Sequence, residues 1–401
     1  MALMPVDDAL ERLLSNAGPL SAETVPIDDA AFRVLAEPIA ALRTQPPFDA
    51  SAMDGYAVRA ADVAAVPARL KVIGEAPAGR GFAGAVGPGE AVRIFTGAPL
   101  PAGADAILIQ ENAERAEDDA ITAIETVQPG RHIRRAGLDF AEGDVLLDAG
   151  RVIDPAALAL AAAANHPALA VVRRPVVAIL ATGDELVAPG ETPQPDQIVA
   201  SNSYGVAAMA QSEGATVLDL GIAPDDRAEI AERTQTALSH PADIIVTLGG
   251  ASVGDHDLVR SVLTGQGMEL DFWKIAMRPG KPLMFGRFGD VRVLGLPGNP
   301  VSAMICAELF LRPLIASLAG REPIDRSETA VLGADMRGND ERRDYVRARL
   351  ADKDGQIIAT PFGTQDSSML KTLAAANALI VREPFAPEAK TGDACRVIRL
   401  R

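Results

Sequence analysis

The chain has 401 residues, which is too long for one ordinary hydrophobic core, so we expect two to four domains. Its residues are 48% hydrophobic and only 4% aromatic, and its formal net charge is -16. This charge argues against nucleic acids and anionic membranes as general partners, because phosphate binding needs a basic surface.

Cysteine usage and the N-terminal segment favour a cytoplasmic protein. Cys306 and Cys395 lack the spacing of metal ligands, and a reducing compartment suits them. Residues 1–14 are acidic and amphipathic, whereas a signal peptide has a basic flank and an apolar centre. The apolar run at 156–164 is too short to span a bilayer and predicts a closely packed helix.

The first third of the chain predicts helices followed by a small β-domain. Apolar residues along one face predict a helix at 6–15, and Asp28-Asp29 predicts the start of a second helix at 30–35. From 69 to 147, short apolar runs are broken by Gly and Pro about every eight to twelve residues, which is typical of an all-β domain.

Three loops in this region carry polar groups. Asp54 precedes a glycine where a turn could present its carboxylate, although Asp-Gly is more often a plain turn. Thr96 places a hydroxyl at the end of a strand. The loop 130–139 packs three arginines into five positions, and either a solvated charge run or an oxyanion site explains them.

After a helix at 155–164 the pattern changes to strand–loop–helix units. Strands at 176–180, 244–248 and 291–296 each end in a polar loop, and in parallel strands such loops gather at one edge of the sheet. The residues that these loops contribute are Thr182, Gly183, Asp184 and Glu185, then Gly249, Gly250, Ser252, Asp255 and Asp257, then Pro297, Asn299, Pro300 and Ser302.

Among the three loops, the one at 249–257 carries the most residues suited to ligand binding. Gly249 and Gly250 let the backbone lie close to a ligand, and Asp255 and Asp257 are spaced to offer oxygen ligands to Mg²⁺. A strand followed by an Asp-rich helix cap is the alternative.

Cations follow later in the same region. Arg278 and Lys281 flank a glycine, and a helix that starts at 301 brings backbone N–H groups and Ser302 toward an anion. Residues 326–401 return to short alternating strands, among which 345–350 alternates cleanly, and they predict a second small β-domain. The loop 363–369 leads into a helix, and a helix cap is the alternative for its serines.

Taken together, the motifs are specific. The following occur in order: Ser-Ala-Met-Asp-Gly-Tyr-Ala (51–57), Phe-Thr-Gly-Ala-Pro-Leu-Pro (95–101), Thr-Gly-Asp-Glu-Leu (182–186), Gly-Gly-x-Ser-x-Gly-x-x-Asp (249–257), Pro-Gly-Lys-Pro (279–282) and Leu-Pro-Gly-Asn-Pro-Val-Ser (296–302). With these motifs the chain closely resembles, over essentially all its length, the molybdopterin molybdenumtransferases, the MoeA family that also includes the gephyrin E domain.

The resemblance implies a multidomain α/β plus β protein and an elongated homodimer. Its expected parts are a helical linker domain (1–45 and 140–173), an inserted β-domain (46–139), a central three-layer α/β molybdopterin-binding domain (174–322) and a C-terminal β-barrel-like domain (323–401). In the family, the active cleft lies between the central domain of one subunit and the N-terminal domains of the other.

The resemblance also implies the reaction. Molybdate is inserted into adenylylated molybdopterin and AMP is released, with Mg²⁺ or a similar divalent ion. Such an enzyme would take its substrate from an adenylyltransferase, with which a transient contact is expected. The chemistry agrees, because tetrahedral oxyanions are held by Lys, Arg, hydroxyls and amides, and a divalent cation neutralises the charge that develops when a phosphoanhydride breaks.

Site residues follow from the matching motifs. Asp54, Thr96, Asp139, Glu185, Asp225 and Asp255 fall at positions that the family uses in its cleft, although Asp226 could replace Asp225 and a helix cap explains both. Glu185, Asp255 and Asp257 can hold the cation. Ser252, Lys281 and Ser302 resemble molybdate or phosphate ligands, and Arg347 and Ser368 resemble residues where molybdate enters. Arg278 stands where the family usually has lysine, so its contact is open.

Three alternatives remain at this point. The preceding adenylyltransferase has a similar central fold, but it is usually one small domain with Gly-Gly-Thr-Gly, whereas this chain has Gly-Gly-Ala-Ser at 249–252. A gephyrin-like scaffold would need a peptide groove, which no motif marks. Tungstate cannot be separated from molybdate, because the two oxyanions are so similar in size.

Overall fold

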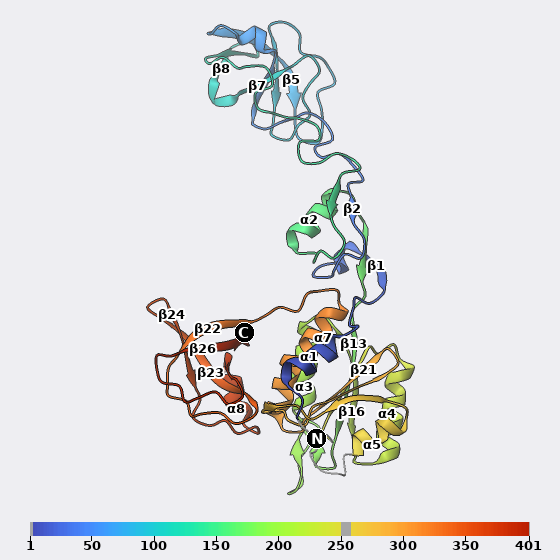
Figure 1. Ribbon diagram of the computed structural model, residues 1–401. Helices are drawn as coiled ribbons and strands as arrows, with labels where there is room; N and C mark the ends of the chain where they lie inside the picture. Colours follow the sequence, from blue (N-terminus) through green and yellow to red (C-terminus); the bar gives the residue numbers. More distant parts are fainter. Residues whose placement is uncertain (1–2, 250–257, 401) are drawn as a thin grey trace. The chain divides into compact units, whose positions relative to one another are not determined.

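The computed structural model describes residues 3–249 and 258–400 (Figure 1). The chain forms two compact units. The larger unit comprises Met1–Glu23, Phe32–Val34 and Val171–Arg401, and the smaller unit comprises Thr24–Ala31 and Leu35–Ala170.

The smaller unit is built around a six-stranded sheet in the order β7-β4-β6-β5-β9-β8. Its strands are β4 (Gly55–Val58), β5 (Ala68–Ala76), β6 (Glu90–Ile94), β7 (Ala106–Ile109), β8 (Ala113–Ala116) and β9 (Ala120–Ala123). Side chains alternate across β4, so that Tyr56 and Val58 enter one apolar cluster and Ala57 enters another on the opposite face. The predicted β-domain is therefore present.

Short elements make up the rest of the smaller unit. They are η1 (Ile27–Asp29), β2 (Ile39–Ala40), β3 (Ala50–Ser51), η2 (Ala60–Val63), η3 (Gln110–Asn112), β10 (Ile133–Arg134), β11 (Val145–Leu147) and α2 (Pro155–Ala163). β3 pairs with β10, and β2 pairs with β11. Asp154 caps α2 by accepting a hydrogen bond from the Ala157 N–H at 2.8 Å. Strands β1 (Ala22–Pro26) and β12 (Ala168–Val172) form a two-stranded sheet.

The helix predicted at 30–35 is wrong. Phe32 adopts a left-handed backbone conformation with φ of 62°, which a continuing helix does not allow. The next residues are then held by the strand at 168–172: the Val172 N–H donates to the Val34 carbonyl at 2.8 Å, and the Arg33 guanidinium donates to the Val172 carbonyl at 2.8 Å. These tertiary bonds outweigh the local helix signal.

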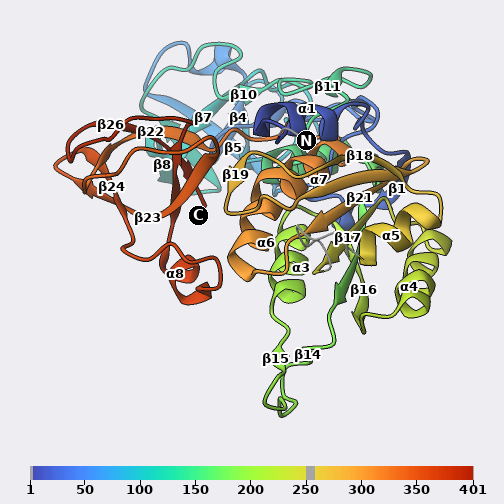
Figure 2. The same ribbon diagram turned by 60° about the horizontal axis from the view of Figure 1, so that its bottom comes forward.

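The larger unit contains a three-layer α/β domain (Figure 2). Its sheet runs β16-β13-β17-β21-β20-β18, with the first four strands parallel and the last two antiparallel. The strands are β13 (Val176–Thr182), β16 (Thr216–Ala223), β17 (Ile244–Leu248), β18 (Glu269–Trp273), β20 (Met284–Phe288) and β21 (Val291–Leu296). All five residues of β17 are buried, as expected of a strand covered on both faces.

Helices cover both faces of this sheet. One face packs against α1 (Val6–Leu14), α3 (Asn202–Ser212), α6 (Pro300–Cys306), the π-helical turn η4 (Ala307–Leu311) and α7 (Arg312–Leu318). The other face packs against α4 (Arg227–Ser239) and α5 (Leu258–Gly265). Among the described residues, the continuous run Pro300–Leu318 has the length and hydropathy of a membrane span, but 67% of it is buried in the protein core.

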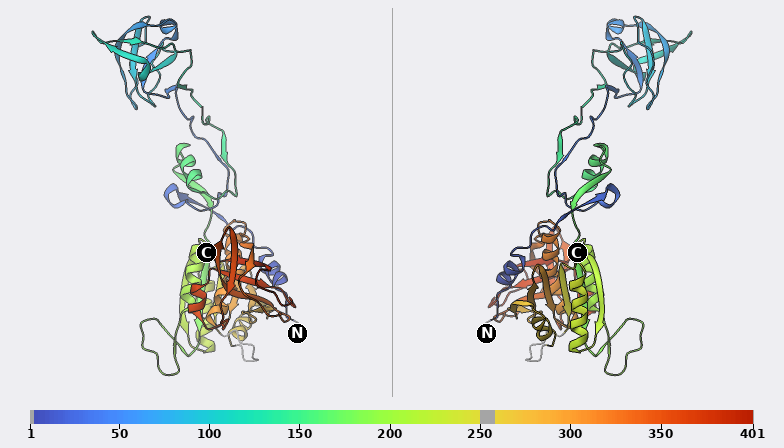
Figure 3. Two further views of the ribbon diagram at one scale, coloured as in Figure 1. Left: turned by 90° about the vertical axis from the view of Figure 1, so that its left-hand side faces the viewer. Right: turned by 90° about the vertical axis from the view of Figure 1, so that its right-hand side faces the viewer.

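The C-terminal strands close into a barrel (Figure 3). Neighbouring strands follow the order β23-β24-β22-β26-β25, and β25 pairs back with β23. The elements are β19 (Met277–Arg278), β22 (Ser327–Leu332), β23 (Arg343–Lys353), β24 (Gln356–Pro361), α8 (Leu370–Ala375), β25 (Ala378–Arg382) and β26 (Ala394–Arg399). β19 leaves the α/β domain and pairs in parallel with β23, which joins the barrel to the loop before Lys281. The multidomain fold class inferred from the sequence is confirmed.

Candidate active site

The three strands that precede the predicted polar loops end together at one edge of the central sheet. β13, β17 and β21 are parallel neighbours, and Leu248 at the end of β17 stands in register with Ala181 and with Leu296. The carboxyl ends of these strands therefore lie side by side, which is the position at which open α/β sheets bind ligands.

A cleft of about 660 Å³ opens at this edge. Its size lies within the range of roughly 300–1,000 Å³ that small-molecule sites occupy. The predicted site residues that line it are Thr182, Gly183, Glu185, Asp225, Gly249, Pro297, Asn299, Pro300 and Ser368. These residues come from five separate segments of the larger unit, so the predicted convergence holds for them.

Glycine is required where two of these loops touch. Gly249 has φ of 94°, and a Cβ atom built on it would lie 2.5 Å from the backbone oxygen of Thr182. Its Cα also lies 3.7 Å from the Cβ position of Gly298 in the third loop. Any side chain at position 249 would push the loops apart, so this glycine sets the floor of the cleft.

The hydroxyl of Thr182 lies within this tightly packed edge. The residue is 2% exposed, and its Oγ1 has no hydrogen-bond partner among the residues that the structure describes. A buried polar atom without a partner is costly and is often found at functional sites. This observation supports the predicted role of Thr182 in binding.

Acidic side chains gather at one end of the cleft. Asp184 Oδ1 accepts a hydrogen bond from the Asp225 N–H at 3.0 Å, and Glu185 lines the cleft beside them. Partial burial, with the negative charges of Asp184 and Glu185, raises the pKa of Asp225 above its ordinary value of 3.8. Like charges held together in this way are typical of a site that accepts a cation.

The structure separates the roles of Asp225 and Asp226. Asp226 is the N-cap of α4, where its Oδ1 accepts hydrogen bonds from Ala228 N–H at 2.8 Å and Glu229 N–H at 3.1 Å. Asp225 makes no cap contact of this kind and lines the cleft. The helix cap therefore explains Asp226 and leaves Asp225 available for the site.

We expect Asp225→Asn to stabilise the metal-free protein slightly at neutral pH. The raised pKa means that ionised Asp225 destabilises the folded state, and asparagine removes this repulsion. The gain should be roughly a few tenths of a kcal/mol, because solvent screens the exposed group. It should grow as pH rises from 3.8 through the folded-state pKa and vanish below 3.8.

Thermal unfolding of both proteins between pH 3 and pH 8 measures this difference. Asp226→Asn is the matched control, because it keeps an N-cap residue and lies outside the acidic group. A melting temperature for Asp225→Asn that falls below that of the wild type at pH 8 would contradict the expected repulsion.

The loop that follows β21 is held by side-chain hydrogen bonds, one of which comes from a residue outside the predicted site. Asn202 Nδ2 donates to the Gly298 carbonyl at 2.7 Å, and Asn299 Nδ2 donates to Ser367 Oγ at 2.9 Å. Residues 201–203 stand at the start of α3, where such residues are typical helix caps, yet Ser201 makes no side-chain cap bond, and all three residues line the cleft. The sequence signal for this role was the run of three polar residues at 201–203, which closely follows the short strand β15 (Ile198–Val199).

The helix start at α6 offers fewer free amides than the sequence predicts. Pro300 has no N–H, and the Val301 N–H already donates to the Ser367 carbonyl at 3.0 Å. Ser302 is only 4% exposed and does not line the cleft. An anion at this edge would therefore depend on side-chain groups more than on the helix start.

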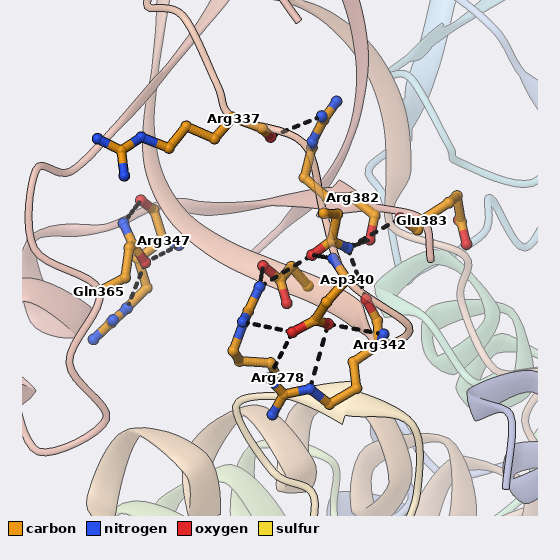
Figure 4. Close-up of polar contacts among 10 residues, drawn as sticks. Arg278, Arg337, Asp340, Arg342, Arg347, Gln365, Arg382 and Glu383 are labelled. Atoms are coloured by element: carbon orange, nitrogen blue, oxygen red, sulfur yellow. Dashed lines mark hydrogen bonds and ion pairs between the residues drawn. The ribbon is translucent and has the colours of Figure 1, made fainter. Parts of the chain in front are cut away.

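Two of the predicted oxyanion ligands come from the barrel. Ser368 lines the cleft, but its hydroxyl donates to Asp366 Oδ1 at 2.6 Å. Arg347 is 1% exposed, and its guanidinium donates to Gln365 Oε1 at 3.1 Å and to the Asp366 carbonyl at 2.7 Å (Figure 4). Burial of the guanidinium lowers the pKa of Arg347, and the negative charge of the Asp366 carboxylate opposes this shift. Lys281 is half-buried beside Pro282, which lines the cleft.

Arg278 lies in a different environment. It donates to Asp340 Oδ2 at 3.0 Å, to Asn339 Oδ1 at 3.0 Å and to Asp344 at short distance, and it does not line the cleft (Figure 4). Arg278 also stands in register with Asp344 in the β19–β23 pairing. The planar guanidinium thus ties the loop before Lys281 to the barrel, a geometry that a single ammonium could not match.

We expect Arg278→Ala to destabilise the larger unit by about 1–2 kcal/mol. The substitution leaves Asp344, whose side chain is 15% exposed, without its closest cation. Adding Asp344→Asn should recover part of the loss, because no uncompensated carboxylate remains. Chemical denaturation measures the effect. Arg349→Ala is the control, because Arg349 is an exposed arginine of β23. Equal denaturation midpoints for Arg278→Ala and Arg349→Ala would contradict a stabilising role of the Arg278 contacts.

The predicted residues of the smaller unit also come together in part. Asp54 Oδ1 accepts hydrogen bonds from the Thr96 N–H at 2.7 Å and the Thr96 hydroxyl at 2.8 Å, and both bonds lower the pKa of Asp54. Asp49 and Arg135 form an ion pair of 2.5 Å that joins the loops at 46–54 and 130–139. Asp139 is exposed in the second of these loops. The arginine run therefore includes a structural ion pair.

The remaining predicted residues lie outside the described part of the chain. They are Gly250, Ser252, Asp255 and Asp257. Among residues 3–249 and 258–400, no group of three or more His, Cys, Asp or Glu side chains is arranged to hold a metal ion. The donors that are described at the cleft, Glu185 and Asp225, carry the carboxylate oxygens that Mg²⁺ prefers, so the donor chemistry fits this ion.

Comparisons with known proteins agree along the whole chain. Sequence profiles match for the MoeA N-terminal region (domain I and II) at residues 4–165, a "Probable molybdopterin binding domain" at 178–317 and the MoeA C-terminal region (domain IV) at 329–400. The chain is 36% identical to a molybdopterin molybdenumtransferase of Haemophilus influenzae, with 98% of this chain and 97% of that protein covered. It is 35% identical to the enzyme of that name from Bacillus subtilis, with 99% and 94% covered.

A solved structure is similar along the whole chain. A molybdopterin biosynthesis MoeA protein from Pyrococcus horikosii superposes with a TM-score of 0.84 and 31% sequence identity. The alignment covers 100% of both chains.

Proposed function

We propose the function of this chain from one premise: it belongs to the molybdopterin molybdenumtransferase (MoeA) family. It is accordingly a transferase of molybdenum-cofactor biosynthesis. The finer proposal is that it inserts molybdate into adenylylated molybdopterin, releases AMP and uses a divalent metal such as Mg²⁺. The 660 Å³ cleft at the carboxyl ends of β13, β17 and β21, which residues from five separate segments line, is the observation that supports this proposal most directly.

The two sides of the cleft suit the two substrates. Molybdate is a tetrahedral dianion, and Lys281, Ser368 and the Ser252 predicted from the sequence offer a cation and hydroxyls to hold and orient its oxygens. The acidic end with Glu185 and Asp225 suits a cation near the phosphoanhydride.

Mg²⁺, when bound, would neutralise charge that develops on the phosphate oxygens. Glu185, together with Asp255 and Asp257, would hold it. Asp225, whose pKa is raised by partial burial and by the charges of Asp184 and Glu185, lies at this same end of the cleft. A homodimer would let the smaller unit of a second copy supply Asp54, Thr96 and Asp139, as the family resemblance implies.

Incubation of the purified protein with adenylylated molybdopterin, molybdate and Mg²⁺ tests the proposal. We expect stoichiometric AMP and a product that activates a molybdenum-free molybdoenzyme. Formation of adenylylated molybdopterin from ATP and molybdopterin, without molybdenum insertion, would instead identify an adenylyltransferase. Failure of both reactions would favour a scaffold. Parallel assays with tungstate would define the preferred oxyanion.

We also propose that the protein acts in the cytoplasm.

A further inference from the structure

A second hollow of about 470 Å³ adjoins the cleft and shares Ser201 and Asn202 with it. Its walls come from α3, α6 and α8, three helices of the larger unit that Figure 2 labels. The lining is mainly aliphatic, with two methionines, Met209 and Met304, among its members. We name it the methionine pocket.

The walls of this pocket depend on a glycine. A Cβ atom at Gly205 would lie 2.7 Å from Met304 Sδ, so the missing side chain lets Met304 pack directly against α3. From α8, Leu373 and Ala374 form the opposite wall. A hollow between helices that shares two lining residues with a polar cleft has the form of a subsite for the apolar end of a ligand.

We propose that the methionine pocket binds the flat, amino-bearing heteroaromatic ring of the substrate, while the phosphate and molybdate groups lie in the cleft. This inference rests on the proposed function, whose substrate carries two such rings, a pterin and an adenine. Thioether sulfur atoms make favourable contacts with aromatic rings, and flexible methionine side chains adapt to a planar ligand.

Polar groups at the rim suit the edge of such a ring. Glu308 lines the pocket, its side chain is 8% exposed, and its carboxylate oxygens accept from Arg312 Nη1 at 2.9 Å each, while Oε1 lies 3.8 Å from Arg326 Nη1. A carboxylate has about four acceptor positions, so it can also accept an amino hydrogen. Asn202 Nδ2 is held by the Gly298 carbonyl, which fixes this side chain between the pocket and the cleft.

Two neighbouring alanines of α8 give a matched test. Ala374 lines the pocket and Ala375 does not, although both are exposed. We expect Ala374→Trp to fill the pocket and weaken ring binding by about ten-fold or more, a loss of ~1.4 kcal/mol. Ala375→Trp should change nothing. Calorimetric titrations of the full-length protein use AMP, 6-hydroxymethylpterin and, as a probe without a ring, ribose 5-phosphate.

The outcomes distinguish adenine from pterin as the occupant of the pocket, and they separate this inference from the proposed function. Loss of AMP binding alone identifies adenine as the occupant, loss of pterin binding alone identifies the pterin, and ribose 5-phosphate should bind equally to all three proteins. Equal ring affinities for both tryptophan variants would overturn the inference. So would a change in sedimentation of Ala374→Trp without a change in ring affinity, because a second copy would then cover the pocket. If ring binding is lost as expected but the wild type inserts no molybdenum, the pocket stands and the proposed function fails.

Discussion

Replacing Glu185 by glutamine is expected to lower the rate of molybdenum insertion by roughly two orders of magnitude or more. Glu185 follows β13 directly and lines the cleft. Its carboxylate folds back over Gly183, where a Cβ atom would lie 2.4 Å from Oε2, so the glycine leaves room for the charge at the sheet edge. Glutamine keeps the size of this side chain and removes only the charge.

Single-turnover release of AMP at saturating substrate measures the effect, with Mg²⁺ varied at each substrate concentration. Because glutamine is a poorer cation ligand, we expect the required Mg²⁺ concentration to rise as the rate falls. Glu191→Gln is the control, since Glu191 lies between β14 (Leu186–Val187) and β15 (Ile198–Val199), outside the cleft lining. A rate for Glu185→Gln within about threefold of the wild type would exclude a direct role for this charge.

Gly55→Ala is expected to destabilise the smaller unit by about 3 kcal/mol or more. Gly55 begins β4, which pairs with β6 on one side and β7 on the other. A Cβ atom here would lie 2.1 Å from the backbone oxygen of Leu108 and 2.9 Å from Ile109 Cα. Both neighbours are backbone atoms of a strand in the sheet, so they cannot rotate away as a flexible side chain would.

Denaturant unfolding, with hydrogen exchange to locate the change in the smaller unit, measures this loss. The same substitution should weaken activity, because Asp54 precedes Gly55 and its bonds to Thr96 depend on the position of the strand. Gly81→Ala is the control, since its nearest neighbour, Pro99, is 3.8 Å from the Cβ position. If Gly55→Ala unfolds at the same denaturant concentration as Gly81→Ala, the packing argument is wrong.

The sequence by itself determined the class of the central domain and the edge at which its site lies. Uninterrupted apolar runs such as 244–248 require cover on both faces, and the polar loops that follow such strands can only leave at the sheet edge. These features depend on residues adjacent in the chain. For the same reason, the alternating pattern at 345–350 was enough to predict the C-terminal β-domain.

Only the tertiary structure decided which polar residues meet. It assigned Asp226 to the cap of α4 and Asp225 to the cleft, turned Arg278 toward Asp340 and Asp344, and bonded Arg33 and Val34 to Val172 in place of a helix. The partners in these contacts are separated by up to 139 residues along the chain. Local propensity is worth only tenths of a kcal/mol per residue, whereas a charged hydrogen bond contributes more, so partners distant in sequence determine the outcome.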